Sequence, residues 1–326
     1  MLKKIVTMAI TGIWLGSSAM NLSAQGGGGN SPAVALPKDN LNIFVIGASL
    51  WMPGGQEQVK RHLESYGCKG IKMDNSRSNP WVYWQHRMHV AGTVDGFSKS
   101  ALPYSAAMAQ KDIDTMAKRM EGKKWDMVLF MGHSTEPIHM VNKVRNVQED
   151  FDLFIAKVRE LAPVAQVVPI MTWFKDSIKS TTPEMWDAVQ TLYRGVAAKY
   201  GTKMVPTGMA FKRVYEERPD INIRVGGADG DGHANALGQY LNVCCIYAVL
   251  TGKSPVGLPP EALDLEEGTT DQSMESDQDR QKKMKDSKKS KGGVASRKVE
   301  IPPDVARYLQ ETAWKVCTEE PLSGCK

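Results

Sequence analysis

The chain has 326 residues and a formal net charge of +5, with 41 Lys and Arg residues against 36 Asp and Glu residues. Charge is concentrated in one segment, whose acidic half (261–279) nearly cancels its basic half (280–298). A segment of this kind without aromatic residues is typical of a solvated, disordered insertion and argues against a nucleic-acid-binding protein. The length is sufficient for one sizeable hydrophobic core.

The N-terminus has the features of an export signal. Lys3 and Lys4 precede an apolar stretch at 5–15, and small residues follow at 17–24. Because the stretch is shorter than the roughly 20 residues of a membrane-spanning helix, we expect a cleaved signal peptide, 1–24, and no stable membrane insertion. Residues 25–40 are rich in glycine and predict a flexible leader. The mature protein is expected to be secreted or periplasmic.

Residues 41–326 are predicted to form one α/β domain. Short apolar runs predict buried strands at 42–47, 127–131, 166–171 and 203–205. Segments with helical periodicity alternate with them or follow them, at 54–66, 107–120, 147–161, 184–200, 234–250 and 302–317. This alternation predicts a flavodoxin-like three-layer sandwich with a mostly parallel central sheet, interrupted by the charged insertion at about 261–298. Ligands of such sheets bind beyond the carboxyl ends of the strands.

A serine follows the first predicted strand. Ser49 stands in the sequence Gly47-Ala48-Ser49-Leu50, where the strand turns toward a helix. A serine hydroxyl becomes a useful nucleophile when a base takes its proton and nearby donors stabilise the oxyanion. Backbone N–H groups at a turn of this kind can be such donors. A turn or helix-capping serine is the alternative interpretation.

A histidine with nearby carboxylates precedes the helix predicted at 234–250. Asp231 lies two residues before His233, and Asp229 lies four before it. A carboxylate beside a histidine can hold its tautomer and stabilise the imidazolium, and either aspartate could take this role. The alternatives are a turn with a surface histidine and a calcium loop. The EF-hand pattern fails because Ala234 stands where that loop requires glycine, counted from Asp229.

The two motifs together resemble the SGNH hydrolases, also called GDSL-like esterases and lipases. Residues 47–50 are similar to the first block of this family, and residues 229–255 are similar to the last block and its helix in secreted bacterial branches. The resemblance implies an ester hydrolase that uses no cofactor, with Ser49 as nucleophile, His233 as base and Asp229 or Asp231 as the orienting acid. It implies a small-molecule or glycan ester as substrate, and we expect an acetylated carbohydrate.

The chain departs from the family pattern around the oxyanion. The family's oxyanion-hole asparagine has no counterpart in the sequence around Gly132, His133 and Ser134. We therefore expect the backbone N–H of Ser49 or Leu50 to act together with Gly132 and a side chain from His133 or Ser134. Loss of one preorganised donor can lower turnover about a hundredfold. The alternative function is a catalytically weak or inactive glycan-binding protein on the same scaffold.

Further departures concern the residues beside the nucleophile and the base. Ala48 replaces the usual Asp or Asn, and Gly230 occupies the position of the usual acid, three residues before the histidine.

Aromatic residues and cysteines complete the candidates. Trp81, Tyr83 and Trp84, with Trp51, predict either a sugar-stacking cleft or core packing. No metal site is expected, because no thiolate pair has zinc-ligand spacing. Two cysteines, at 317 and 325, flank a short tail and could close a terminal loop in an exported protein, and those at 244 and 245 are predicted to be buried thiols.

Overall fold

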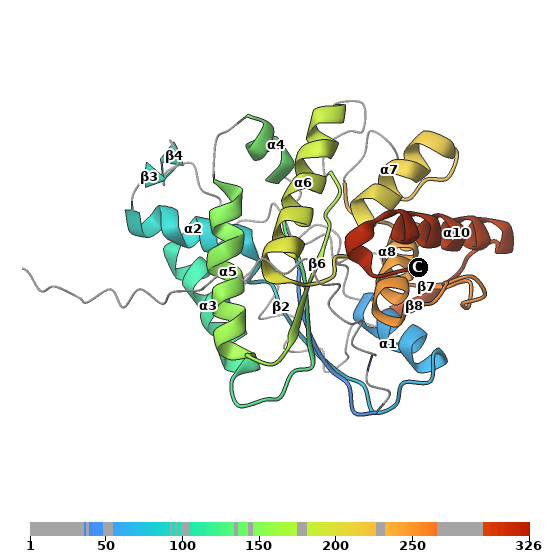
Figure 1. Ribbon diagram of the computed structural model, residues 1–326, viewed down its shortest axis with the longest axis horizontal. Coiled ribbons are helices and arrows are strands. Elements are labelled where there is room, and N and C mark those ends of the chain that lie inside the picture. Colours follow the sequence, from blue (N-terminus) through green and yellow to red (C-terminus); the bar gives the residue numbers. More distant parts are fainter. Residues whose placement is uncertain are drawn as a thin grey trace, which may run out of the picture. The chain divides into compact units, whose positions relative to one another are not determined.

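A four-stranded parallel sheet lies at the centre of the fold (Figure 1). The computed structural model describes residues 36, 39–47, 55–91, 93–94, 97–98, 105–133, 136–142, 146–174, 181–225, 232–265 and 296–326. The strands are β1 (Asn42–Ile46), β2 (Lys72–Ser76), β5 (Met127–Met131) and β6 (Gln166–Ile170), in the order β2-β1-β5-β6. The predicted α/β class and mostly parallel sheet are confirmed.

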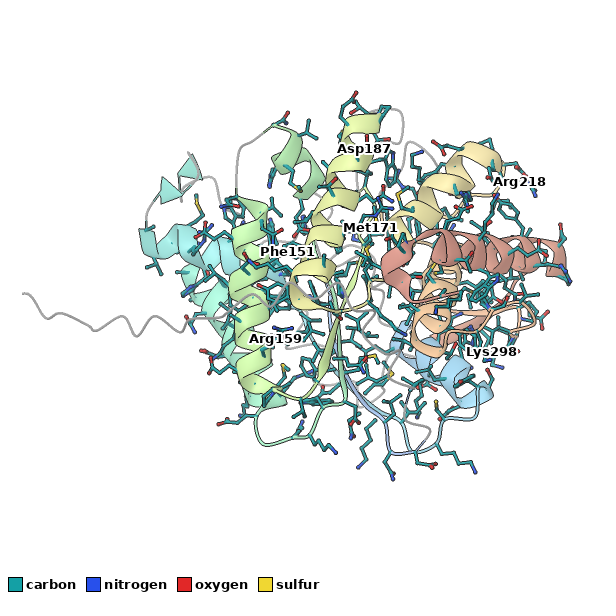
Figure 2. All side chains as sticks on the ribbon, in the orientation of Figure 1. Phe151, Arg159, Met171, Asp187, Arg218 and Lys298 are labelled. Carbon is teal, nitrogen blue, oxygen red and sulfur yellow. The ribbon has the colours of Figure 1, made fainter. Side chains whose placement is uncertain are left out.

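Helices cover both faces of the sheet because its strands are apolar on both sides. In β1, Ile43 and Val45 enter one core, whereas Phe44 and Ile46 enter the other. Helices of the first core are α1 (Gly55–Ser65), α7 (Thr207–Glu217), α8 (Ala236–Thr251) and α10 (Pro303–Glu319). Helices of the second are α3 (Ala106–Met120), α5 (Val147–Leu161) and α6 (Pro183–Tyr200). Figure 2 shows the side chains that fill these layers, among them the buried Phe151 of α5.

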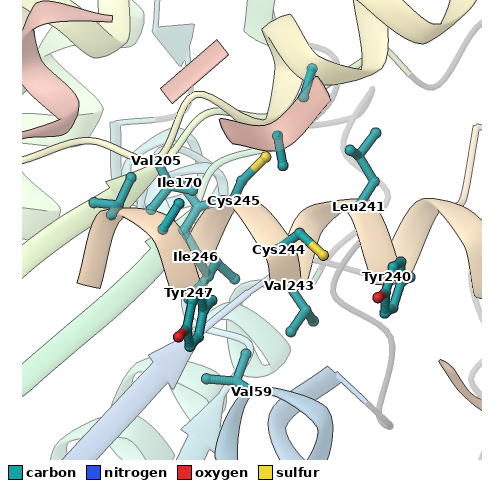
Figure 3. Close-up of a cluster of buried hydrophobic side chains, with 14 of the residues drawn as sticks. Val59, Ile170, Val205, Tyr240, Leu241, Val243, Cys244, Cys245, Ile246 and Tyr247 are labelled. Atoms are coloured by element: carbon teal, nitrogen blue, oxygen red, sulfur yellow. The ribbon is translucent and has the colours of Figure 1, made fainter. Parts of the chain in front are cut away.

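Helix α8 is buried on nearly all sides. Its residues from Gly238 to Leu250 are all buried, as expected of a helix without a polar face. In Figure 3, Val243 and Tyr247 point toward Val59 of α1, whereas Cys245 points to the other side of the helix. The helix ends at Gly252, whose φ of 66° is left-handed, a conformation that glycine adopts at little cost. The position of α8 is therefore fixed by packing around its whole circumference.

Some elements differ from the sequence prediction. The edge strand β2 and helix α2 (Pro80–Ala91) were not predicted, and neither were α4 (Glu136–Val141), α7, the short pair β3 (Thr93–Val94) and β4 (Phe97–Ser98), or the 3₁₀ helix η3 (Pro321–Ser323). The strand predicted at 203–205 is reduced to one parallel bridge between Val205 and Ile170. Pro206 follows directly and has no N–H with which to extend a ladder.

The two ends of the predicted charged insertion form an antiparallel pair. Strands β7 (Glu261–Leu265) and β8 (Ser296–Glu300) run from the pairing of Glu261 with Glu300 to that of Leu265 with Ser296. Lys298 Nζ lies 2.8 Å from Glu261 Oε2, so the acidic and basic halves attract each other here. The insertion is thus narrower than 261–298. Residues 266–295, the predicted signal peptide and most of the predicted leader lie outside the described residues.

Among the helices that the structure describes, none combines the length and the apolar character that a membrane crossing requires.

Candidate functional site

The carboxyl edge of the sheet brings three strand ends level. Ile46 lies opposite Phe130, and Met131 lies opposite Ile170, so β1, β5 and β6 end at the same height. The N–H of Gly47 donates to the carbonyl of Ser76 over 3.1 Å and extends the β1–β2 ladder by one residue. The chain segments that leave these strands therefore emerge at one edge, where ligands bind in open parallel sheets.

The loop that carries His233 is anchored beside the end of β6. The indole Nε1 of Trp173 donates to the carbonyl of Gly232 over 2.8 Å. Trp173 is fully buried and stacks on Phe211 of α7, with ring centroids 4.1 Å apart. Because Trp173 lies three residues beyond β6, this bond holds the residue before His233 at the carboxyl edge of the sheet.

The backbone on the other side of His233 is held as well. Its carbonyl accepts the N–H of Val225 over 2.9 Å, and Ala234 forms an antiparallel bridge with Arg224. The side chain of His233 is 8% exposed. The structure thus fixes the predicted base in a nearly buried position, with hydrogen bonds from two separate segments.

Residues at the start of α8 explain how the loop that carries His233 is held in place. Asn235 caps the helix, since its Oδ1 accepts the N–H groups of Leu237 (3.0 Å) and Gly238 (3.1 Å). Its Nδ2 donates to the carbonyl of Asn222 over 2.9 Å. A Cβ at position 238 would overlap the carbonyl oxygen of Ile223. The glycine therefore allows the 222–225 segment to approach α8 closely and hold the histidine loop.

The turn after β5 is fixed by a buried tyrosine that the sequence did not single out. The N–H of Gly132 donates to Tyr193 Oη over 3.0 Å, and the backbone of Thr172 lies close enough to the same hydroxyl to lower its pKa. A Cβ at position 132 would overlap the carboxylate of Glu136 and lie 2.7 Å from Tyr193 Oη. Only glycine fits here without movement of these neighbours. Tyr193 thus joins the turns that follow β5 and β6.

The electrostatics of this turn keep Tyr193 neutral. Burial raises the pKa of Tyr193 well above its usual value, and the charge of Glu136 raises it further, against the opposing effect of the Gly132 and Thr172 backbones. Gly132 was predicted to help stabilise the oxyanion. In this structure its N–H donates to Tyr193. The absence of a side chain at Gly132 allows the close approach of Glu136 and Tyr193 in this turn.

His133 follows directly and stacks on an aromatic residue of α2. Its ring lies 4.6 Å from that of Trp81 at an angle of 14°, and both side chains are partly exposed. Trp84 is buried, 4% exposed, and Tyr83 packs edge-on against Phe154. Trp81 thus contacts a candidate site residue, whereas Trp84 is buried and the partly buried Tyr83 packs against the second core.

Five predicted site residues lie outside the described residues, namely Ser49, Leu50, Ser134, Asp229 and Asp231. Their roles stay predictions. The sequence missed Tyr193 and Trp173. Tyr193 looks like an ordinary apolar position of an amphipathic helix, whereas the position of Trp173 just after a predicted strand was a usable signal. Within the part of the chain that the structure describes, no group of three His, Cys, Asp or Glu side chains could hold a metal ion.

Comparisons with known proteins give matches among solved structures. No protein-family model and no curated protein matches the chain. A candidate GDSL-like lipase from Parabacteroides merdae is 12% identical, with a TM-score of 0.44, over 67% of this chain and 99% of that one. A candidate SGNH hydrolase from Slackia heliotrinireducens is 12% identical, with a TM-score of 0.42, over 64% and 97%.

A catalytic mutant of an acetylxylan esterase from Geobacillus stearothermophilus is 13% identical, with a TM-score of 0.41, over 66% of this chain and 94% of that one. Two of these structures, those from Slackia heliotrinireducens and Parabacteroides merdae, bear a name of the family that the motifs at 47–50 and 229–255 resemble.

Proposed function

We propose that the chain is an exported serine ester hydrolase of the SGNH type that removes acyl groups, foremost acetyl groups, from a carbohydrate. The observation that carries the proposal is the anchoring of His233, whose loop is bonded through Gly232 to Trp173 at the end of β6. A nearly buried histidine at the carboxyl edge of a parallel sheet is well situated to act as a base.

Covalent geometry supports Ser49 as its partner. Ser49 follows Gly47 by two residues, so its Cα lies within about 7.6 Å of the Gly47 Cα, which continues the β1 ladder. Strands β1 and β6 are separated by β5 alone, a spacing of about 10 Å between them. His233 belongs to a loop that is bonded to Trp173, three residues beyond β6, so this spacing supports a place for Ser49 at the same edge of the sheet as the histidine loop.

In the proposed reaction Ser49 Oγ attacks the acyl carbon while His233 takes its proton. His233 then protonates the departing alcohol, and the same residue activates a water molecule that releases the acid from the acyl-enzyme. Asp229 or Asp231 orients the imidazole. The oxyanion is held by the backbone N–H of Ser49 or Leu50, with a side chain from His133 or Ser134.

Trp81 supports a carbohydrate as the substrate. Its partly exposed indole lies flat against His133, one of the proposed oxyanion residues. An aromatic face beside the reacting group can pack against a sugar ring while the ester reaches the nucleophile.

A second function, glycan binding with little or no catalysis, is favoured by one observation. The N–H of Gly132, which was expected near the oxyanion, donates to Tyr193 Oη. If no other group replaces this donor, turnover falls by about a hundredfold or more.

Turnover of p-nitrophenyl acetate tests the catalytic proposal. Ser49→Ala and His233→Ala are expected to lose it, whereas Ser254→Ala, a matched change beyond the opposite end of α8 from His233, retains it. Equal turnover by all variants contradicts the serine–histidine mechanism and leaves the binding function.

Trp81→Ala tests the substrate class. We expect a higher KM for a soluble acetylated oligosaccharide and an unchanged KM for p-nitrophenyl acetate, which has no sugar ring. An equal change of both KM values contradicts sugar stacking.

A further inference from the structure

Three cysteines lie together where the C-terminal segment crosses α8. Cys245 belongs to α8, Cys317 lies near the end of α10, and Cys325 follows η3. All three are thiols in this structure and are buried. Cys317 Sγ lies 3.8 Å from the carbonyl oxygen of Cys245, and Cys325 Sγ lies 3.3 Å from that of Ala248. The two C-terminal thiols therefore lie over carbonyls of α8 that are three residues, or about one helical turn, apart.

The segment between Cys317 and Cys325 is folded so that their side chains meet. The two thiols are close enough to shift each other's pKa, in opposite directions. Ser323 Oγ donates to the carbonyl of Cys317 and accepts the N–H of Cys325 over 2.9 Å. Gly324 turns the chain back with a left-handed φ of 75°. This turn is further held to the domain, because the N–H of Met204 donates to the carbonyl of Leu322 over 2.9 Å.

The three cysteines differ in exposure, and the two C-terminal thiols differ in the direction in which their pKa is shifted. Burial raises the pKa of Cys317 well above its usual value, whereas the neighbouring Cys317 thiol lowers the pKa of Cys325, aided by the charge of Lys203. Cys325 is 9% exposed, and Cys317 and Cys245 are not exposed at all. Because the thiolate is the attacking species, Cys325 is the more reactive thiol of the C-terminal pair, and it is the most exposed of the three cysteines.

We propose that Cys317 and Cys325 are a disulfide-forming pair that closes the C-terminal loop over α8, with Cys245 left as a thiol. The thiolate of Cys325 attacks an external disulfide, that of oxidised glutathione or of a thiol–disulfide oxidoreductase, and releases one thiol. Cys317 then loses its proton and attacks the Cys325 sulfur of the mixed disulfide, which releases the second thiol. Two cysteine thiols are oxidised, and one external disulfide is reduced to two thiols.

Trypsin digestion gives a direct test on the full chain. Cleavage after Lys315 leaves the peptide 316–326, which contains both cysteines of the pair and no other, while Cys244 and Cys245 fall together in the peptide 225–253. The protein is equilibrated with oxidised or reduced glutathione, denatured in acid, alkylated and digested. With oxidised glutathione we expect the 316–326 peptide to be two hydrogen atoms lighter and unalkylated, and both cysteines of the 225–253 peptide to be alkylated.

Melting measurements give a second readout. Closure of a nine-residue loop restricts the unfolded chain, so the oxidised protein should melt about 5 °C higher than the reduced protein. Cys325→Ser should abolish this difference, and Cys68→Ser, a buried cysteine outside the cluster, should preserve it. Alkylation of both cysteines of the 316–326 peptide after exposure to excess oxidised glutathione, or a bond between Cys317 and Cys245, overturns the proposal.

Discussion

Mild acid is expected to destabilise the protein through His62. This side chain is 3% exposed on α1 and meets the ring of Tyr240 of α8 edge-on, with centroids 6.0 Å apart. Burial and, to a smaller extent, the charge of Arg61 lower the pKa of His62 to about 4 against the opposing charge of Glu261 of β7. Nε2 of His62 has no hydrogen-bond partner among the described residues. The imidazole is therefore neutral in the folded protein at neutral pH.

The sign and size of the effect follow from the pKa values. A histidine in the unfolded chain titrates near pH 6.5, so the unfolded state binds more protons than the folded state between about pH 6.5 and 4. The free energy of unfolding must then decrease as the pH falls through this window. The difference between 6.5 and about 4 corresponds to about 3 kcal/mol in full, of which most is lost by pH 4.5.

Urea unfolding at pH 7.5 and 4.5, followed by tryptophan fluorescence, measures this loss. His62→Phe keeps an aromatic ring against Tyr240 and removes the titrating group. The decrease in unfolding free energy between the two pH values should therefore be about 2–3 kcal/mol smaller in this variant than in the wild type. Titrating carboxylates affect both proteins alike. His86→Phe, at a partly exposed position of α2, should behave as the wild type. An equal decrease in His62→Phe and the wild type would refute the reasoning.

Two further substitutions test the supports of the candidate site. Tyr193→Phe removes the hydroxyl that accepts the N–H of Gly132 and interacts with the backbone of Thr172. We expect the free energy of unfolding, measured by urea denaturation at pH 7.5, to fall by about 1–3 kcal/mol. A loss below about 0.5 kcal/mol would count against the link between the two turns. Trp173→Phe keeps an aromatic ring beside Phe211 but removes the hydrogen bond to Gly232. The kcat for p-nitrophenyl acetate should therefore fall about five- to tenfold, with little change in KM. An unchanged kcat would show that this hydrogen bond does not position His233 for catalysis.

The strands that could be predicted are those buried on both faces. Apolar runs identified β1, β5 and β6, because each of these strands has helices on both sides. The edge strand β2, with the sequence KMDNS, has no such run, and its place is decided by hydrogen bonds to β1. The ladder of β7 and β8 was hidden in a charge-rich segment, where composition suggested disorder although the two ends attract each other.

The site was predictable where it is local in sequence. The position of His233 before a long helix was evident from the residues around it, and Asn235 and Gly238 now account for the geometry of that helix start. The contacts that hold the site are not local. Tyr193 is 61 residues from Gly132, and Trp173 is 59 residues from Gly232. The position of Trp173 after a strand could mark it as a residue of the sheet edge, but nothing in a single sequence indicates which distant glycine it or Tyr193 contacts.

The pairing of Leu265 with Ser296 has a consequence for how this chain can vary. Leu265 and Ser296, which flank residues 266–295, are neighbours across an antiparallel ladder. The distance between these two residues is therefore set by the ladder and does not depend on the length of the segment that connects them. The entropic cost of closing a loop rises only by about 0.6 kcal/mol for each doubling of its length. Insertions, deletions or a grafted reporter in this interval should therefore cost the rest of the domain little, which makes it a natural place for change during evolution and for engineering.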